Sequence, residues 1–310
     1  MSTPTLVPDP AVDTDVPAVV ATPEPASPVV SDTTATRGRV RRWAGHLLLG
    51  LGIVLAVFLA YEFVFTGYYE ARAQHTLLPE FQQRMAEGGG FDSLTAPVPS
   101  GPVALIQIPA IGVDQVVVEG SSPQNLKQGP GHMPGSPLPG EFGNSVIQGH
   151  RLTYGGPFGK LDQLKPGDVI TTVTGLGKFS YKVDRVRVIV PGESDVIGPA
   201  LKSELTLVTS RAVGSTDRLA VIASLVGHPV GVPKRPPVAV GSDEQGTTGD
   251  MTGLLAAVLW AQVLIVLLVV AGRLYRRWPK MAVYLMTTAP ILTVLWLTFQ
   301  SLDRFLPGTL

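Results

Sequence analysis

The sequence predicts a mainly β domain in a membrane protein, with one transmembrane helix before the domain and two after it. Short β-branched runs separated by turn residues fill the chain from residue 102 to 228, and such runs are typical of a barrel or a sandwich. Apolar stretches long enough to cross a bilayer lie at residues 47–65, 254–271 and 281–299. Only 15% of the 310 residues are charged, whereas soluble domains carry about 25%.

The composition excludes several kinds of function. Lys and Arg together number 24, as do Asp and Glu, so no excess of positive charge indicates nucleic-acid binding. The chain has no cysteine, which rules out disulfides, thiolate chemistry and cysteine-based metal sites. An exported domain of this composition relies on its hydrophobic core alone for stability.

The first 66 residues read as a tail and a membrane anchor. Residues 1–36 are rich in Pro, Thr, Val, Asp and Ala without periodicity, which predicts a disordered tail; a regulatory binding role is the alternative. Four arginines from Arg37 to Arg42 precede the first apolar stretch, so residues 37–66 are expected to be a basic flank and a transmembrane helix. Because basic residues stay on the cytoplasmic side, we expect the tail in the cytoplasm and the domain outside.

Residues 67–101 are expected to form a stalk and linker. Residues 70–85 favour helix, although Pro79 is expected to start a new segment or to kink the first one. The glycines at 88–90 and the Pro/Gly-rich run at 96–101 end any helix. Such a stalk would hold the next domain away from the membrane.

The central segment, residues 102–228, carries strand signals throughout. β-branched runs lie at residues 103–109, 113–119, 169–174 and 179–190, and the last two flank a Gly-Leu-Gly turn as a hairpin. Residues 129–135 are dense in Gly and Pro and predict a loop. A segment of this length is sufficient for one independent core.

The C-terminal part reads as a linker and two membrane helices. Residues 229–250 are a polar, Pro/Gly-rich linker, 251–272 and 281–300 are the second and third transmembrane helices, and 301–310 form a short tail. The loop at residues 273–280 contains three arginines and one lysine, so the positive-inside rule places it in the cytoplasm. This orientation agrees with that of the first helix and leaves the domain and the short tail outside.

Two stretches place chemically useful side chains at strand ends. Residues 143–168 read GNSVIQGHRLTYGGPFGKLDQLKPGD, a short apolar strand that ends on His150 and opens into a Gly/Pro-rich loop. Residues 205–210 read LTLVTS, a buried strand that ends on Ser210, and a short loop leads to a strand headed by Arg218. A rigid sheet can hold an imidazole, a hydroxyl and a guanidinium together when all three lie at strand ends.

These motifs resemble those of the sortases, a family of surface transpeptidases with a closed β-barrel and a catalytic histidine, cysteine and arginine. They are most similar to the class E type of actinobacteria, whose strands read G-N-x-x-I-x-G-H-R-x-x-Y-G-x-P-F-x-x-L and T-L-x-T-C, and the match covers roughly residues 102–228. The resemblance implies a sortase-type closed β-barrel with His150 and Arg218 as catalytic residues. It places Ser210 where the family has its catalytic cysteine. The loop before Arg218 is slightly shorter than usual and lacks the proline that often follows that cysteine.

The resemblance also implies partners and a location. The substrates would be sorting-signal peptides of surface proteins, and the acceptors would be amines of the cell wall or of pilins. No cofactor is implied, and the sequence shows no carboxylate cluster for a Ca²⁺ ion, so we expect no metal. We expect a multi-pass protein of the cell membrane, with an extracellular barrel and a cytoplasmic N-terminal tail.

Serine in place of cysteine is the main departure from the family. A thiol, with a pKa of about 8.5, can ionise with help from a nearby imidazole. A hydroxyl needs a well-aligned general base, usually one oriented by a carboxylate. No motif residue supplies that carboxylate, because Asp217 is expected to pair with Arg218 or with solvent. Three interpretations stay open: Ser210 as a nucleophile, a barrel that has kept its groove and lost its chemistry, and a deliberate Cys-to-Ser change.

Plain structural roles are the alternatives for single residues. His150 alone could cap a turn, Arg218 could be a solvated strand residue, and His132, in a Gly-Pro-Gly-His loop, is expected to pack that loop. For the whole chain, the first hypothesis is a sortase-family transpeptidase or hydrolase that acts on or binds sorting peptides, with catalysis impaired at Ser210. The alternative is a non-catalytic sortase-like module for peptide binding or membrane assembly.

Overall fold

The computed structural model describes residues 45, 48–50, 52–88, 98, 100–190, 193, 195–212, 215–232 and 251–305. The predicted disordered tail, the basic flank of the first helix and most of the linker at 229–250 lie outside these residues. The chain divides into two compact units, Met1–Gly52 and Ile53–Leu310. The described residues of the first unit are helical, and the elements below belong to the second.

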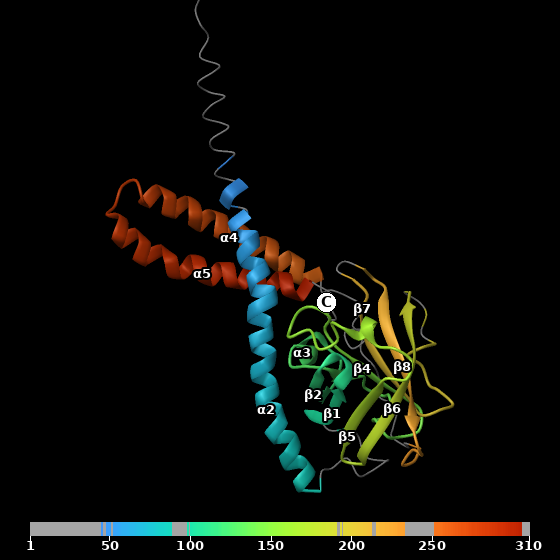
Figure 1. Ribbon diagram of the computed structural model, residues 1–310. Helices are drawn as coiled ribbons and strands as arrows, with labels where there is room; N and C mark the ends of the chain where they lie inside the picture. The colour runs from blue at the N-terminus through green and yellow to red at the C-terminus, as the bar shows by residue number, and fades with distance from the viewer. Residues whose placement is uncertain are drawn as a thin grey trace, which may run out of the picture. The chain divides into compact units, whose positions relative to one another are not determined.

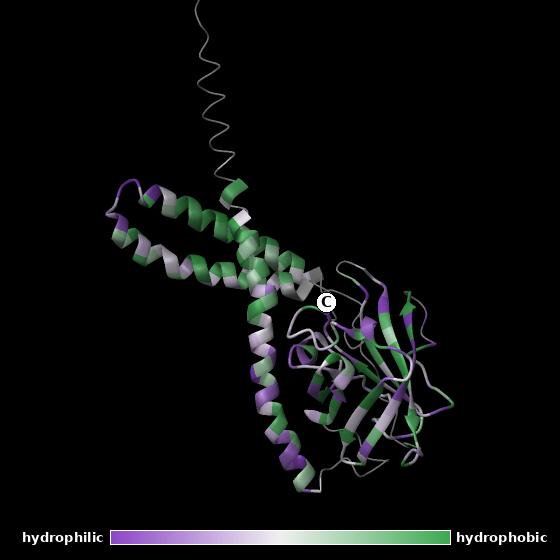
Figure 2. Cartoon of the chain, in the orientation of Figure 1, coloured by the Kyte–Doolittle hydropathy of each residue, from purple (hydrophilic) through white to green (hydrophobic). Residues whose placement is uncertain are grey.

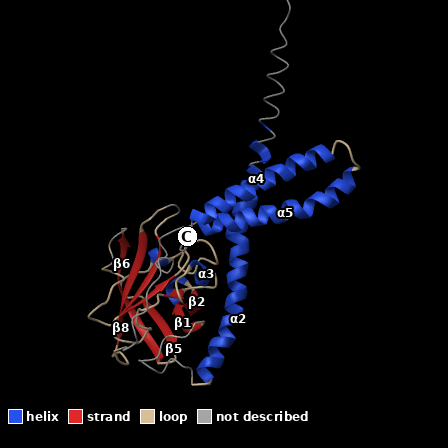
Figure 3. Cartoon of the chain, turned by 180° about the vertical axis from the view of Figure 1, so that it is seen from behind, coloured by secondary structure: helices blue, strands red, loops and turns tan. Residues whose placement is uncertain are grey.

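Eight strands form a closed barrel (Figures 1 and 3). The strands are β1 (Pro102–Ile108), β2 (Val113–Glu119), β3 (Gly131–His132), β4 (Asn144–Gln148), β5 (Val169–Thr174), β6 (Gly177–Ile189), β7 (Glu204–Ser210) and β8 (Arg218–Val226), with short helical turns at η2 (Pro109–Ile111), α3 (Pro123–Leu126) and η3 (Leu161–Gln163). Around the barrel the order is β1-β2-β3-β4-β7-β8-β6-β5, and β1 pairs with β5 to close it. The predicted fold class, a closed β-barrel with flanking apolar helices, is confirmed.

The pairing of β4 with β7 decides which residues meet at one end of the barrel. These two strands run parallel, with Gln148 opposite Val208. Strands β7 and β8 form an antiparallel hairpin in which Ser210 is opposite Arg218. Because neighbouring parallel strands end at the same edge, the residues that follow β4 reach the same end of the barrel as Ser210 and Arg218.

Alternate residues of the strands fill the barrel interior. On β7 and β8 the interior positions are Leu205, Leu207, Leu219, Val221 and Ala223, each at most 6% exposed. Burial of one such leucine or valine side chain stabilises the fold by about 1.5–3 kcal/mol. Since side chains alternate across a strand, the residues between these positions face outward. There Ala220 and Ile222 pack with Ile189 and Val196 in a second cluster.

One strand was not expected from the sequence. Residues 129–135 predict a loop, but Gly131 and His132 form β3, which pairs parallel to β2 and antiparallel to β4. A Cβ on Gly131 would lie 2.3 Å from the carbonyl oxygen of Gly120, so only glycine allows this close approach. Two residues are too few to show the alternation on which strand prediction depends.

A long helix leads into the barrel. Residues 52–60 are α-helical, Tyr61–Phe65 form a π-helical turn (η1), and α2 continues over Thr66–Ala86. The Thr66 N–H donates to the carbonyl oxygen of Tyr61, which is the wider hydrogen bond of a π-helix.

Helix α2 is continuous through Pro79, so no new segment begins there, which was one of the two predictions for this proline; the kink stays a prediction. Leu77 and Phe81, on either side of the proline, pack against Val116 and Val118 of β2. Tertiary packing of these side chains therefore stabilises the helix despite the proline. The described helical part of the expected stalk therefore packs against the barrel.

Within the part of the chain that the structure describes, three helices are long and apolar enough to cross a membrane: Leu48–Ala86, Thr252–Leu274 and Lys280–Leu302. The last two lie within α4 (Met251–Leu274) and α5 (Lys280–Phe305), and α5 continues through Pro290. Figure 2 shows hydrophobic residues along α4, along α5 and along the helix that precedes α2. The three long apolar helices that the sequence predicted are therefore present.

Aromatic side chains join the first of these helices to α5. The ring centroids of Phe58 and Phe299 are 5.1 Å apart. The rings of Tyr61 and Phe65 lie 5.2 and 4.9 Å from that of Trp296, both edge to face. Such aromatic pairs contribute about 0.5–1.5 kcal/mol each beyond simple burial. The cluster therefore packs the helix just before α2 against α5.

Candidate functional site

Ser210 and Arg218 are neighbours across the hairpin of β7 and β8. They are opposite each other in the antiparallel register, which puts their Cβ atoms about 4.5–5.5 Å apart. Since Leu207 and Leu219 point into the core, the alternation of side chains places Ser210 and Arg218 on the outer side of the barrel wall. Ser210 is nevertheless only 4% exposed.

His150 follows β4 and lies beside the end of β7. Thr209 Oγ1 donates a hydrogen bond to the carbonyl oxygen of Gly149 at 2.9 Å. Arg151 Nη1 donates to the carbonyl oxygen of Ser210 at 3.1 Å. Because these bonds fix the residues on both sides of His150, the histidine is held next to Ser210. The backbone positions of His150, Ser210 and Arg218 therefore lie at the same end of the barrel.

Two residues that the sequence interpretation missed contact the His150 ring. Thr153 Oγ1 lies 3.0 Å from His150 Nδ1, and the Tyr154 ring centroid lies 4.9 Å from that of the imidazole. The Thr153 hydroxyl orients the ring, but it has no charge with which to stabilise an imidazolium, as the carboxylate of a serine protease does. The signal in the sequence was the spacing, three and four residues after His150 in a glycine-rich loop.

Arg218 has an unsatisfied hydrogen-bond donor. Its Nη2 atom is buried and has no hydrogen-bond partner among the residues that the structure describes. Burial also lowers the pKa of this guanidinium. A buried donor without a partner costs about 1–3 kcal/mol, so a ligand oxygen next to Ser210 would relieve that cost.

Asp217, which precedes Arg218, is paired with Arg211. Its Oδ2 lies 3.0 Å from Nη1 of Arg211, and its carbonyl oxygen accepts a hydrogen bond from the Arg211 N–H. The sequence predicted that Asp217 would pair with Arg218 or with solvent, whereas its carboxylate pairs with Arg211. Arg211 and Asp217 are the residues next to the Ser210–Arg218 pair. Because side chains alternate along a strand, they point to the opposite side of the hairpin, away from Ser210 and Arg218.

Comparison with known proteins identifies the domain. Residues 106–226 match the family model of the sortase domain. Sortase D of Bacillus subtilis (strain 168) is 27% identical over 106 residues, which are 34% of this chain and 52% of that protein. Sortase SrtE1 of Streptomyces coelicolor is 28% identical over 173 residues, which are 52% of this chain and 47% of that protein. Residues 106–226, which make up most of the barrel, are therefore similar to the sortase domain. Its matches span about half the length of these two curated relatives.

Solved sortases also match this sortase domain. Sortase E of Streptomyces avermitilis is 33% identical, with a TM-score of 0.38, and the match covers 42% of this chain and 91% of that one. A sortase C of Clostridium perfringens, solved with the C-terminal cell wall sorting motif, is 26% identical, with a TM-score of 0.39, and the match covers 51% of this chain and 90% of that one. The two curated relatives are a sortase D and SrtE1, so the class E assignment stays a prediction.

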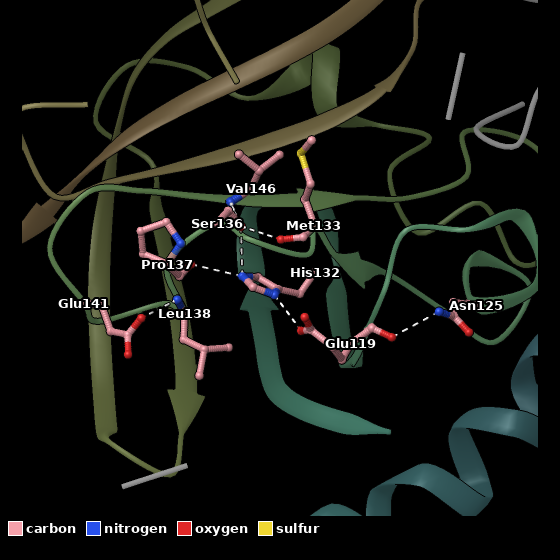
Figure 4. Close-up of polar contacts among 9 residues, drawn as sticks. All are labelled: Glu119, Asn125, His132, Met133, Ser136, Pro137, Leu138, Glu141 and Val146. Atoms are coloured by element: carbon pink, nitrogen blue, oxygen red, sulfur yellow. Dashed lines mark hydrogen bonds and ion pairs between the residues drawn. The ribbon is translucent and has the colours of Figure 1, made fainter. Parts of the chain in front are cut away.

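The sortase domain contains a second buried histidine, His132, at the end of β3 (Figure 4). Its Nδ1 lies 2.6 Å from Glu119 Oε2, and its Nε2 lies 3.0 Å from both the Pro137 carbonyl oxygen and Ser136 Oγ. Burial lowers the pKa of His132, but the Glu119 carboxylate beside it and the hydrogen bonds outweigh burial, so the net shift of the pKa is upward. A protonated ring donates from both nitrogens, which matches these acceptors.

This cluster has the connectivity of a Ser-His-acid triad but not its chemistry. A protonated Nε2 cannot accept a proton from Ser136, whose hydroxyl donates to the carbonyl oxygen of Met133 at 2.8 Å. The imidazolium therefore fixes the loop between β3 and β4, which is the packing role that the sequence suggested for His132.

Proposed function

We propose that this protein is a membrane-anchored sortase-family protein that binds sorting-signal peptides of surface proteins and is catalytically impaired by Ser210. The observation that carries the proposal is the place of Ser210, at the end of β7, opposite Arg218 and next to His150, in a chain without cysteine. His150, Ser210 and Arg218 form the proposed site, and no metal or cofactor takes part. The barrel lies outside the cell and the N-terminal tail in the cytoplasm.

The impairment follows from the difference between a hydroxyl and a thiol. A cysteine thiol, with a pKa of about 8.5, ionises within the range that an imidazole can assist, whereas a serine must lose its proton to a well-oriented base during attack. In serine proteases, loss of the aspartate that orients this base lowers kcat about 10⁴-fold. Here the group at His150 Nδ1 is the uncharged hydroxyl of Thr153, so Ser210 receives little activation.

Peptide binding is supported by the state of Arg218. A carbonyl or carboxylate oxygen of a peptide next to Ser210 would accept a hydrogen bond from the unsatisfied Nη2. In an active sortase, the same donor would also stabilise the oxyanion that forms during acyl transfer. The sorting motif bound to the Clostridium perfringens sortase C indicates the class of peptide. An amine acceptor, of the cell wall or of a pilin, would be needed only by a form that transfers the peptide.

The alternative is a non-catalytic module of a membrane assembly. The aromatic contacts of Tyr61 and Phe65 with Trp296 favour this alternative, because they pack the first helix against α5. A protein anchored by a single helix would not need such contacts. On this alternative the barrel needs no peptide, and Ser210 is a structural residue.

Peptide binding to the full-length protein in nanodiscs tests the proposal. Titration calorimetry with synthetic sorting-signal peptides should show saturable binding, and mass spectrometry should find almost no covalent adduct on Ser210. Arg218→Ala should weaken binding about tenfold or more, because a hydrogen bond from a charged group contributes about 1.5–3 kcal/mol.

Arg211→Ala is the matched control for this experiment. Arg211 lies seven positions before Arg218, at the end of the same hairpin, and its partly exposed side chain pairs with Asp217. Removal of the Arg211 side chain should therefore leave peptide binding unchanged. A folded protein that binds no sorting peptide would favour the assembly module instead.

A further inference from the structure

Tyr154 adopts a backbone conformation that is unfavourable for a large side chain. Its φ is 48°, and among the described residues it is the only one other than glycine with a positive φ. It is also 4% exposed. A bulky residue in the left-handed region costs about 1–3 kcal/mol and persists only where its surroundings impose it. The strained residue lies directly against the His150 ring, with 4.9 Å between the centroids.

Helix α2 supplies the contacts that hold Tyr154. The Tyr154 N–H donates a hydrogen bond to Thr66 Oγ1 at 3.1 Å, and the Tyr69 ring meets the Tyr154 ring edge to face at 6.2 Å. Thr66 and Tyr69 are three residues apart, so they lie on the same face of the helix. Lys127, which belongs to the barrel domain, makes a cation–π contact with the Tyr154 ring, with its Nζ 5.4 Å from the ring centroid.

The π-helical turn η1 prepares Thr66 for this contact. In this turn the Thr66 N–H donates to Tyr61 O instead of to the carbonyl one residue further along. The carbonyl oxygen of Glu62 accepts the Thr66 hydroxyl hydrogen instead. Because the Thr66 hydroxyl donates its hydrogen to Glu62, its Oγ1 can accept the hydrogen bond from the Tyr154 N–H.

Polar contacts fix α2 on the barrel just beyond Tyr69. Gln74 Nε2 donates to the carbonyl oxygens of Val116 and Gln128 at 3.0 and 2.8 Å, and its Oε1 accepts the Val116 N–H at 2.8 Å. Glu70 Oε1 accepts a hydrogen bond from Gln115 Nε2 at 2.8 Å. These bonds leave α2 little freedom to slide along the barrel.

Gly155 lets the helix come close to the loop that follows His150. A Cβ on Gly155 would lie 2.6 Å from Glu70 Oε2, and the residue has a φ of +73°. Gly67 of α2 faces the same glycine, since its own Cβ would lie 3.7 Å from the Gly155 nitrogen. Both chain segments are therefore shaped for close contact between α2 and this loop.

We propose that α2 is a positioning element of the site: Thr66 and Tyr69 hold Tyr154 in its left-handed conformation, and Tyr154 fixes the orientation of the His150 imidazole. The inference rests on the proposed role of His150 in the site. Thr66, Tyr69 and Tyr154 are positioning residues, because they act through His150 and not on the peptide. The membrane-anchored helix thereby becomes part of the functional unit.

Nitrogen NMR of the histidine rings in the full-length protein tests this inference directly. The chain has five histidines, and the His150 signals are those lost in His150→Asn. In the native protein they should form one set of ring signals, because the Thr153 hydroxyl and the Tyr154 ring hold the imidazole in one orientation. Thr66→Val and Tyr154→Ala should replace this single set by several exchanging sets of signals, while Thr66→Ser and Tyr154→Phe, which keep the acceptor and the ring, should preserve it.

Thr76→Val is the matched control on α2, since the Thr76 hydroxyl makes the same kind of bond to the carbonyl four residues earlier but on the exposed face. The His132 signals report on the fold in each sample, and Tyr154→Ala provides the test even where Thr66→Val fails to fold. An unchanged His150 pattern in a folded Tyr154→Ala protein would overturn the inference. Because no peptide is used, this result does not depend on whether the protein binds sorting signals.

Discussion

The side chains around Ser210 suit a thiol better than a hydroxyl. Arg218 presents an unsatisfied donor, and His150 is oriented by the hydroxyl of Thr153. A thiolate and an imidazolium stabilise each other as an ion pair, so a cysteine at position 210 would need no third charged group. A serine at the same position does need one, and the nearest candidate in sequence, Asp217, pairs with Arg211.

His132 should make stability depend on pH. Its pKa is raised in the folded state, so the stabilisation from its pair with Glu119 is complete below the unfolded-state pKa of about 6.5 and is lost as pH rises through the folded-state value. We expect His132→Gln to cost about 3 kcal/mol at pH 6, because it leaves the Glu119 carboxylate without its buried partner. The cost should shrink as the pH is raised.

Thermal unfolding of the full-length protein at several pH values measures this cost. His75→Gln is the control, since His75 is exposed on α2, and it should leave the unfolding midpoint unchanged at every pH. A difference between native and His132→Gln that grows with pH would contradict the ion pair.

The sequence predicted the three site residues but not the contacts that orient them. His150, Ser210 and Arg218 stand at strand ends in recognisable motifs, and strand pairing then determines that they meet. The contact of Thr153 with His150 depends on the path of a loop whose strained residue leaves no pattern in the sequence. The partner of Asp217 depends on which side of the hairpin each residue faces, and the motif alone does not show that.

At the scale of the elements, the docking of α2 should depend on the missing side chain of Gly155. Gly155→Ala introduces a Cβ 2.6 Å from Glu70 Oε2 at a φ of +73°. We expect a loss of about 1–2 kcal/mol from backbone strain, and a further loss of about 1 kcal/mol because the Glu70 carboxylate must move away from Gln115. Thermal unfolding should show the lower stability, and limited proteolysis should cut α2 more rapidly.

Gly112→Ala is the control for Gly155→Ala, because Gly112 has the same φ of +73° and no atom lies within 4 Å of the position that its Cβ would occupy. It should show the backbone cost alone and leave α2 protected. Equal losses in the two variants would mean that the approach of Glu70 to Gly155 contributes nothing.

Regular elements were predicted well and contact-dependent ones were not. The β-branched runs at 113–119 and 169–174 coincide with β2 and β5, and the expected hairpin joins β5 to β6. Helix α2 passes through Pro79 because of packing against β2, which a local rule for proline cannot foresee. The two-residue strand β3 exists only because β2 and β4 lie on either side of it.

At the scale of the whole molecule, the two basic clusters predict the orientation in the membrane. Residues 37–42 and 273–280 should both lie in the cytoplasm, which leaves the barrel outside. Reporter fusions before Arg37 should be active only as cytoplasmic reporters. Protease added to intact cells should cut this protein near Lys160, in the loop that follows β4. A barrel protected from external protease would contradict this orientation.

The rate of peptide cleavage by Ser210→Cys tests the central claim, that the protein has kept its site and lost its nucleophile. With full-length protein in nanodiscs and labelled sorting-signal peptides, Ser210→Cys should turn over at least about 10²-fold faster than the native form, because His150 can assist a thiol. His150→Ala in that background should abolish the gain, and Arg218→Ala should reduce it. Native protein that cleaves the peptides as rapidly as Ser210→Cys, and loses this activity in Ser210→Ala, would contradict the claim.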